Sequence, residues 1–236
     1  MDPDGKANAL WKFDRWGNGS YAKRRNGKLV FFGTGDRWGG AVVASRRGAE
    51  SDFFTSPVTV TADGISFRGE GLTGKQQVLR VAFASEQKTG YSARDAVTFS
   101  FYGDGGVIVG YKLGEPQKDP EAIFKLLDTH VTGNITGFTL VLDSRGYDLK
   151  VVHTDGFGKV AVTPYQAPFT LKGPGLKREA WGAPAGRRTG GNGNSSLSLA
   201  GQQLQAQPSN TVTIEVGSLT AIREKAPSNE KPAGAR

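Results

Sequence analysis

The sequence contains no cysteine, one methionine and only two histidines, His130 and His153. A chain without cysteine has no disulfide, thiolate nucleophile, iron–sulfur cluster or cysteine-ligated zinc site. Two histidines are also too few for a three-histidine metal centre. No apolar run approaches the roughly 18 residues that a membrane-spanning helix requires, so no membrane span is expected. These absences exclude several classes of enzyme and membrane protein.

Of the 236 residues, 37% are hydrophobic and 22% are charged, which is typical of a globular protein rather than a disordered or fibrous one. No linker-like stretch divides the chain, and β-sandwiches of this length form one unit. We therefore predict a single domain over residues 1–222. Residues 223–236 are polar and are predicted to form a disordered C-terminal tail.

Positive charge is concentrated in the first fifth of the chain. The formal net charge is +8, and the segment from Lys12 to Arg47 contains nine basic residues against two acidic ones. Such a stretch favours an acidic partner, for example a uronate polysaccharide, nucleic acid or an anionic surface. The simpler interpretation is that these residues lie on the solvated faces of β-hairpins.

Apolar and polar residues alternate along most of the chain, which predicts half-buried strands in antiparallel sheets. Turn-forming pairs such as Asn26-Gly27 and Asp63-Gly64 separate the alternating segments. About twelve strands are predicted, at residues 29–32, 41–44, 58–61, 65–68, 78–83, 97–102, 107–111, 138–142, 147–152, 160–163, 197–199 and 212–222. Strands at this spacing predict an all-β fold, either a sandwich or a barrel.

One segment departs from the two-residue period. Asp119 has the properties of a helix N-cap, Pro120 suits the first helical position, and Ile123 and Leu127 lie at helical spacing. This pattern predicts one short helix near residues 119–128.

Three features resemble the concanavalin A-like lectin/glucanase superfamily, which includes laminin-G-like jelly rolls. They are an opening strand and turn at 26–30 (NGKLV), a central hairpin at 138–152 (FTLVLDSRGYDLKVV) and a closing segment at 197–222. The resemblance covers most of residues 10–222. It implies an antiparallel β-sandwich of the jelly-roll kind, with a concave side that binds glycans.

The superfamily also contains glucanases and alginate-type lyases, whose motifs are missing here. The glucanase motif E-x-D-x-x-E places three carboxylates on one face of a strand. Glu50 and Asp52 begin such a motif, but no third acid follows. The Arg-Glu-Leu and Gln-Ile-His signatures of the lyases are also absent. The sequence therefore favours binding over catalysis, with a polysaccharide lyase or glycoside hydrolase as the alternative.

The tetrapeptide Asp-Arg-Trp-Gly occurs twice, at residues 14–17 and 36–39. A tryptophan ring can stack on the apolar face of a sugar while a neighbouring arginine binds its hydroxyl or carboxylate groups. The alternative is that both indole rings close the ends of the core. The candidate ligand-binding residues from this repeat are Arg15, Trp16, Arg37 and Trp38.

Three more binding candidates lie elsewhere, namely Arg178 and Trp181 beside a glycine-rich stretch, and Tyr91. Jelly rolls of this kind often bind a structural calcium ion, for which Asp2 and Asp4 are the candidate ligands. Either histidine could serve in acid–base chemistry beside a substrate, but nothing in their spacing requires it.

The leading hypothesis is a non-catalytic carbohydrate-binding domain that recognises a polysaccharide, acidic or neutral, through exposed aromatic and basic residues. A purely structural module is a further alternative. Nucleic acid is disfavoured as a partner because no oligonucleotide-binding fold or helix-turn-helix pattern is visible. A secreted or periplasmic location is expected, although the residues that follow Met1 lack the features of a signal peptide.

Overall fold

The structure, a computed structural model, describes residues 11–45, 57–84, 96–112, 123–143, 145–168 and 196–223. Within these ranges the chain forms sixteen β-strands in three sheets and one short 3-10 helix, η1 (Gly74–Gln76). The predicted all-β sandwich is thus confirmed. Most of the predicted tail lies outside the described residues.

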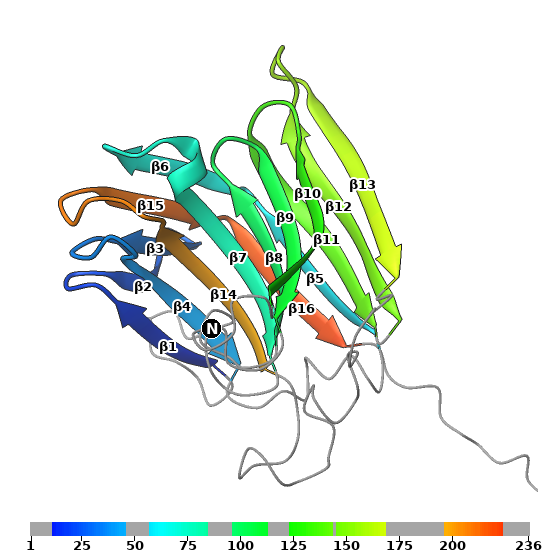
Figure 1. The fold of residues 1–236 in the computed structure, drawn as a ribbon, viewed down its shortest axis with the longest axis horizontal. Helices are drawn as coiled ribbons and strands as arrows, with labels where there is room; N and C mark the ends of the chain where they lie inside the picture. Colours follow the sequence, from blue (N-terminus) through cyan, green and yellow to red (C-terminus); the bar gives the residue numbers. More distant parts are fainter. Residues whose placement is uncertain are drawn as a thin grey trace, which may run out of the picture.

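The strands are arranged in two layers (Figure 1). The front layer is a seven-stranded sheet in the order β1 (Trp11–Trp16), β4 (Gly40–Ser45), β14 (Ser196–Gln203), β7 (Gln77–Ala84), β8 (Ala96–Tyr102), β9 (Gly106–Lys112) and β10 (Ile123–His130). Behind it lies a five-stranded sheet in the order β13 (Val160–Pro168), β12 (Gly146–Thr154), β11 (Ile135–Asp143), β5 (Val58–Asp63) and β16 (Ser218–Arg223). Beside that sheet lies a four-stranded one in the order β2 (Tyr21–Arg25), β3 (Lys28–Gly33), β15 (Thr211–Val216) and β6 (Ser66–Glu70).

The two rear sheets are joined by chain segments that bend from one into the other. β5 continues into β6 through Gly64, whose φ of +64° favours glycine. β15 continues into β16 through Gly217, whose N–H donates a hydrogen bond to the carbonyl of Asp63 (2.8 Å). The single closing strand predicted over 212–222 is therefore two strands, because the bend at Gly217 interrupts the ladder.

The core lies between the layers and follows the predicted alternation. Phe99 and Phe101 of β8 point inward with no exposed surface, as do Phe138 and Leu140 of β11. The rings of Phe101 and Phe138 stack across the two layers, with centroids 4.4 Å apart and planes 9° from parallel. Tyr147 packs edge-on against Phe99 at 5.3 Å, and burial raises the pKa of its hydroxyl.

The prediction of a helix near residues 119–128 is wrong over its described part. Residues 123–130 form β10, which pairs antiparallel with β9, and the register shifts by one between Lys125 and Leu127. A β-bulge of this kind puts two successive residues opposite one, so Leu126 and Leu127 both pack against the core. The shift breaks the two-residue period and imitates helical spacing. Residues 113–122 lie outside the described residues.

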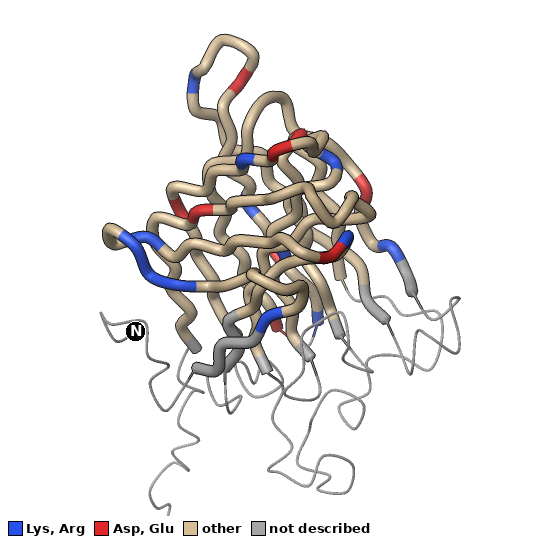
Figure 2. Tube along the Cα trace, turned by 90° about the vertical axis from the view of Figure 1, so that its left-hand side faces the viewer, with Lys and Arg blue, Asp and Glu red and all other residues tan. Residues whose placement is uncertain are grey.

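Much of the basic N-terminal segment lies on one hairpin. Residues 23–25, at the end of β2, form the longest run of positive charge in Figure 2, and Lys28 follows at the start of β3. All four of these side chains are exposed. The interpretation of this charge as a solvated hairpin face agrees with their positions.

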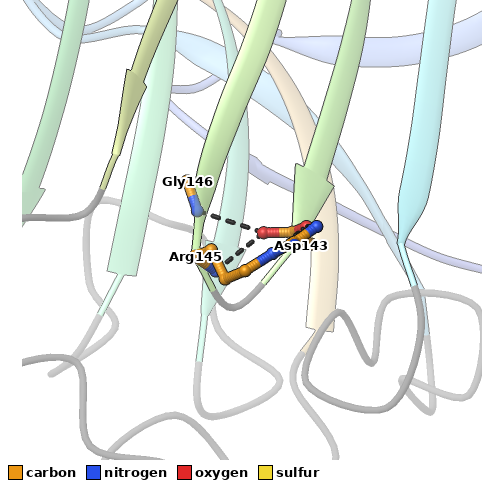
Figure 3. A network of polar contacts seen from close by, with 3 residues as sticks. All are labelled: Asp143, Arg145 and Gly146. Carbon is orange, nitrogen blue, oxygen red and sulfur yellow. Dashed lines mark hydrogen bonds and ion pairs between the residues drawn. The ribbon is translucent and has the colours of Figure 1, made fainter.

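The predicted central hairpin is present as β11 and β12, with Asp143 opposite Gly146. The Asp143 carboxylate accepts hydrogen bonds from the backbone N–H groups of Arg145 (2.7 Å) and Gly146 (3.1 Å), and it pairs with the Arg145 guanidinium at 2.7 Å (Figure 3). Partial burial alone would raise the pKa of Asp143. The hydrogen bonds and the charge of Arg145 outweigh that effect, so this pKa lies below its ordinary value.

Replacing Asp143 with alanine should lower the free energy of unfolding by about 1 kcal/mol at pH 7, because two turn N–H groups lose their acceptor. A lowered folded-state pKa stabilises the fold above the unfolded-state pKa of about 3.9, and this contribution disappears as the pH falls through the folded value. The difference in unfolding free energy between wild type and Asp143→Ala, measured by urea titration, should therefore shrink below about pH 4. Asp143→Asn, which keeps an acceptor oxygen without charge, is the control. A deficit that stays constant from pH 7 to pH 2.5 would contradict the role of the charge.

Candidate functional site

The candidate site is a pocket at one end of the seven-stranded sheet, which we call the Trp38 pocket. It has a volume of about 470 Å³. Its lining comes from the β3–β4 loop, η1, the β8–β9 turn, β10 and the β14–β15 loop. The aromatic and charged side chains of its lining, with its one histidine, are Trp38, Lys75, Tyr102, Asp104, Asp128 and His130.

Cross-strand register explains why distant residues meet at this end of the sheet. One row of partners runs from Trp16 through Gly40, Gln202 and Val78 to Tyr102. Directly paired residues project from the same face of a sheet. Trp16 and Tyr102 therefore project from the outer face, away from the core, at the pocket end.

The turn between β8 and β9 places one carboxylate in the pocket. The Asp104 Oδ1 accepts a hydrogen bond from the Gly106 N–H (3.0 Å), and its Oδ2 lies 3.3 Å from Nε2 of His130. His130 ends β10 directly opposite Gly106. The Asp104 side chain is 23% exposed and the His130 side chain 56% exposed, so both groups remain accessible to a ligand.

A second carboxylate of the pocket belongs to β10. Asp128 forms an ion pair with Lys125 at 2.6 Å, and this hydrogen bond, with the attraction between the charges, raises the pKa of Lys125. Both side chains are largely exposed. The pocket thus has hydrogen-bond acceptors on one side and an aromatic ring, Trp38, among its other lining groups.

The loop that carries Trp38 is fixed by several hydrogen bonds. Asp36 Oδ1 accepts a bond from the Trp38 N–H (2.8 Å), and the Ala206 N–H donates to the carbonyl of Arg37 (3.0 Å). The side-chain amide of Gln203 donates to the carbonyl of Asp36. These contacts connect the loop to β14 and the segment after it. The backbone that carries the Trp38 indole is therefore held in place without help from a ligand.

The two Asp-Arg-Trp-Gly copies are neighbours in space. The Trp16 indole N–H donates a hydrogen bond to the carbonyl of Trp38, while the Arg15 guanidinium donates to the carbonyl of Ser20 (3.3 Å). The Arg37 guanidinium lies 5.8 Å from the centre of the Trp38 ring, within range of a cation–π contact. Trp38 lines the pocket, and Trp16 supports the Trp38 loop through a backbone contact, whereas Arg15 contacts the β1–β2 connection.

The structure does not place the remaining predicted site residues. Asp2, Asp4, Tyr91, Arg178 and Trp181 lie outside the described residues. No group of three His, Asp or Glu side chains that could hold a metal ion occurs in the described ranges. Among the described residues, no helix has the length and the apolar character that a membrane span requires.

His153 is a structural residue. It is 5% exposed, its Nδ1 donates to the carbonyl of Thr132 (2.7 Å), and its Nε2 lies 2.9 Å from the Thr163 hydroxyl. Both ring nitrogens thus have partners inside the second layer. His130 has the accessibility that acid–base or binding chemistry requires, and His153 has not.

Sequence reasoning missed Tyr102, Asp104 and Asp128 as pocket residues. Asp104 lies between the strands predicted at residues 97–102 and 107–111, and Asp128 belongs to the segment predicted as helical. Only the antiparallel pairing of β9 with β10 brings His130 beside Asp104. A strand prediction for residues 123–130 would still not have revealed this pair, because alternation does not show which strand lies next to another.

Two antiparallel layers, with a seven-stranded sheet facing two smaller ones, define a concanavalin A-like jelly roll. The resemblance of the sequence to that superfamily is confirmed at the level of the fold. No family model matches the sequence, and no curated protein matches it either.

Solved structures with this fold include lectins and polysaccharide-degrading enzymes. The exoplasmic domain of VIP36, solved with Ca²⁺ and Man3GlcNAc, has 7% identity and a TM-score of 0.54 over 95% of this chain and 90% of its own. A family 16 glycoside hydrolase endo-glucanase from Bacteroides ovatus has 9% identity and a TM-score of 0.52 over 94% and 98%. The alginate lyase from Klebsiella pneumoniae has 8% identity and a TM-score of 0.50 over 92% and 96%. At such identities the likeness establishes the fold and not the activity.

Proposed function

We propose that this protein is a non-catalytic carbohydrate-binding domain that holds part of a polysaccharide in the Trp38 pocket. The observation that carries the proposal is the presence of Trp38 and Tyr102 in one pocket with Asp104 and His130. Aromatic rings contact the apolar faces of sugars, and fixed carboxylates accept hydrogen bonds from sugar hydroxyls. The pocket contains both signs of charge, so it fits a neutral sugar as well as an acidic one.

The distribution of acids favours binding over glucanase-type hydrolysis. The five inner strands of the seven-stranded sheet, β4, β14, β7, β8 and β9, contain neither Asp nor Glu. A hydrolase needs two carboxyl groups that flank the scissile bond, and those strands supply none. Arg80 and Ser100, which hydrogen-bond at 3.0 Å, project from the middle of the outer face instead.

Trp38→Ala should weaken binding to the cognate glycan about 5- to 150-fold, because the sugar loses a stacking contact that contributes about 1–3 kcal/mol. Affinity electrophoresis in gels that contain mixed-linkage glucan, laminarin, mannan or alginate would identify the glycan and measure the loss. Phe157→Ala is the matched control, since Phe157 is a 91% exposed aromatic residue on the β12–β13 turn. Equal retardation of wild type and Trp38→Ala would remove the pocket from the proposal, and no retardation of the wild type in any gel would end it.

A polysaccharide lyase or glycoside hydrolase is the second candidate, because Asp104, Asp128 and His130 share the pocket. Incubation with the same glycans separates the two functions. New reducing ends would identify a hydrolase, and absorbance of an unsaturated uronate would identify a lyase. Asp104→Asn should abolish either signal if it arises in this pocket.

We also propose a structural calcium ion and a secreted or periplasmic location. A structural calcium ion on Asp2 and Asp4 would make glycan binding sensitive to EDTA, which the same gels can measure. A secreted or periplasmic location is supported by the polysaccharide ligand proposed here, and fractionation of the producing cells would test it.

A further inference from the structure

The outer face of the four-stranded sheet combines aromatic rings with cations. One row of cross-strand partners on this face is Tyr21, Phe32, Thr213 and Arg68. Its three inter-strand spacings of about 4.8 Å extend the row to about 14 Å. A hollow of about 730 Å³ follows this face, and none of its lining residues belongs to the Trp38 pocket.

The aromatic part of the face is ordered by contacts within the sheet. The rings of Tyr21 and Phe32 stack with centroids 5.1 Å apart and planes 22° from parallel. The Lys23 ammonium lies 4.3 Å from the centre of the Tyr21 ring. Both rings remain partly exposed. An apolar platform with a cation at its edge is therefore present without any ligand.

The cations of the face exceed its carboxylates. Lys23, Arg25, Lys28 and Arg68 project from it, against Glu70 and Glu215. Glu215 pairs with Lys28 at 2.7 Å. This hydrogen bond, and then the charges of Lys28, Arg68 and Arg25, hold the pKa of Glu215 below its usual value. Within the described part of the chain no carboxylate lies within ion-pair distance of Arg25 or Arg68, so their guanidinium groups are available to an anion.

We propose that this face is a second binding surface, which holds an acidic polysaccharide independently of the Trp38 pocket. Guanidinium groups bind carboxylates through paired hydrogen bonds, so Arg25 and Arg68 would contact uronate carboxylates along the chain. Phe32, in the same cross-strand row as Arg68, would contact the apolar side of a sugar ring. The Glu70 carboxylate, which accepts a hydrogen bond from the Thr211 hydroxyl at 3.3 Å, would also accept hydrogen bonds from sugar hydroxyls.

The same face fits nucleic acid less well. Single-stranded nucleic acid binders combine base-stacking rings with a groove that is positive along its length. Here Glu215 and Glu70 lie among the cations, and a DNA backbone has no hydroxyl groups along it that could donate hydrogen bonds to them. Carboxylates are instead useful to a ligand rich in hydroxyl groups.

The test compares two double variants of the full chain. Arg25→Gln/Arg68→Gln removes two charges from the face, and Lys150→Gln/Lys159→Gln removes two exposed charges from the five-stranded sheet and its β12–β13 turn. Retardation in gels that contain polygalacturonate should correspond to an affinity about tenfold weaker for the first variant and unchanged for the second. Phe32→Leu, which keeps an apolar side chain but removes the ring, should also weaken binding. Far-UV circular dichroism would verify that each variant is folded.

Three outcomes would overturn the proposal. They are wild-type mobility unaffected by polygalacturonate at 50 mM salt, equal affinity of the two double variants, and tighter binding of oligo(dT) than of polygalacturonate. Trp38→Ala distinguishes this surface from the pocket. This variant should bind the glycan identified for the pocket more weakly and keep its affinity for polygalacturonate. The experiment can therefore contradict the proposed pocket without contradicting the proposed second surface, and the reverse.

Discussion

Replacing Phe138 with alanine should lower the free energy of unfolding by about 3–5 kcal/mol, the usual cost of deleting a buried aromatic ring. The ring has no exposed surface and stacks on Phe101 at 4.4 Å. Because Phe101 belongs to the front sheet and Phe138 to the rear one, the pair joins the two layers directly. The cavity left in Phe138→Ala would lie between two rigid sheets that cannot close it.

Urea-induced unfolding followed by tryptophan fluorescence would measure this loss. Phe157→Ala removes the same side chain from a 91% exposed position, and its unfolding free energy should stay within about 0.5 kcal/mol of wild type. A Phe138→Ala loss below 1.5 kcal/mol would show that the two layers are not held together by this stack.

Gly133→Ala should destabilise the fold by about 3 kcal/mol or more. Gly133 has a φ of +79°, and a Cβ there would collide with the carbonyl oxygen of Thr154. Alanine would therefore meet both backbone strain and a clash in the turn between β10 and β11. Since His130 precedes this turn, the variant should also weaken glycan binding in the Trp38 pocket.

Gly158→Ala separates the two causes. Gly158 has nearly the same φ, +78°, but nothing lies within 4 Å of the position that its Cβ would take. The free energy of unfolding of this variant should fall by only about 1 kcal/mol, which is the strain of alanine in the left-handed region. Thermal unfolding of both variants would measure the difference. Equal losses would mean that the β10–β11 turn adjusts to a side chain and that the clash has no cost.

The alternation of residues predicted much of the fold because each strand buries one face. The β11–β12 hairpin shows this most clearly, since Phe138, Leu140 and Leu142 alternate with more exposed neighbours. β1 and β2 were not predicted, because charged residues interrupt the apolar pattern in both. β10 was predicted as a helix because its bulge disturbs the period.

The candidate site was less predictable than the fold. Trp38 could be predicted because the repeated tetrapeptide is a pattern of consecutive residues, which can be read without knowing the strand order. Tyr102, Asp104 and His130 come together only through the order β7-β8-β9-β10. Alternation has the same form in every strand, so it specifies which face a residue occupies and not which strand lies next to it.

The bulge in β10 has a consequence for the solubility of the molecule. β10 is the last strand of its sheet, and no described strand pairs with its outer side. An open edge of this kind can template pairing with another chain. The irregular ladder between Lys125 and Leu127, together with the exposed charges of Lys125 and Asp128, opposes such edge-to-edge association and keeps the rim beside the Trp38 pocket free.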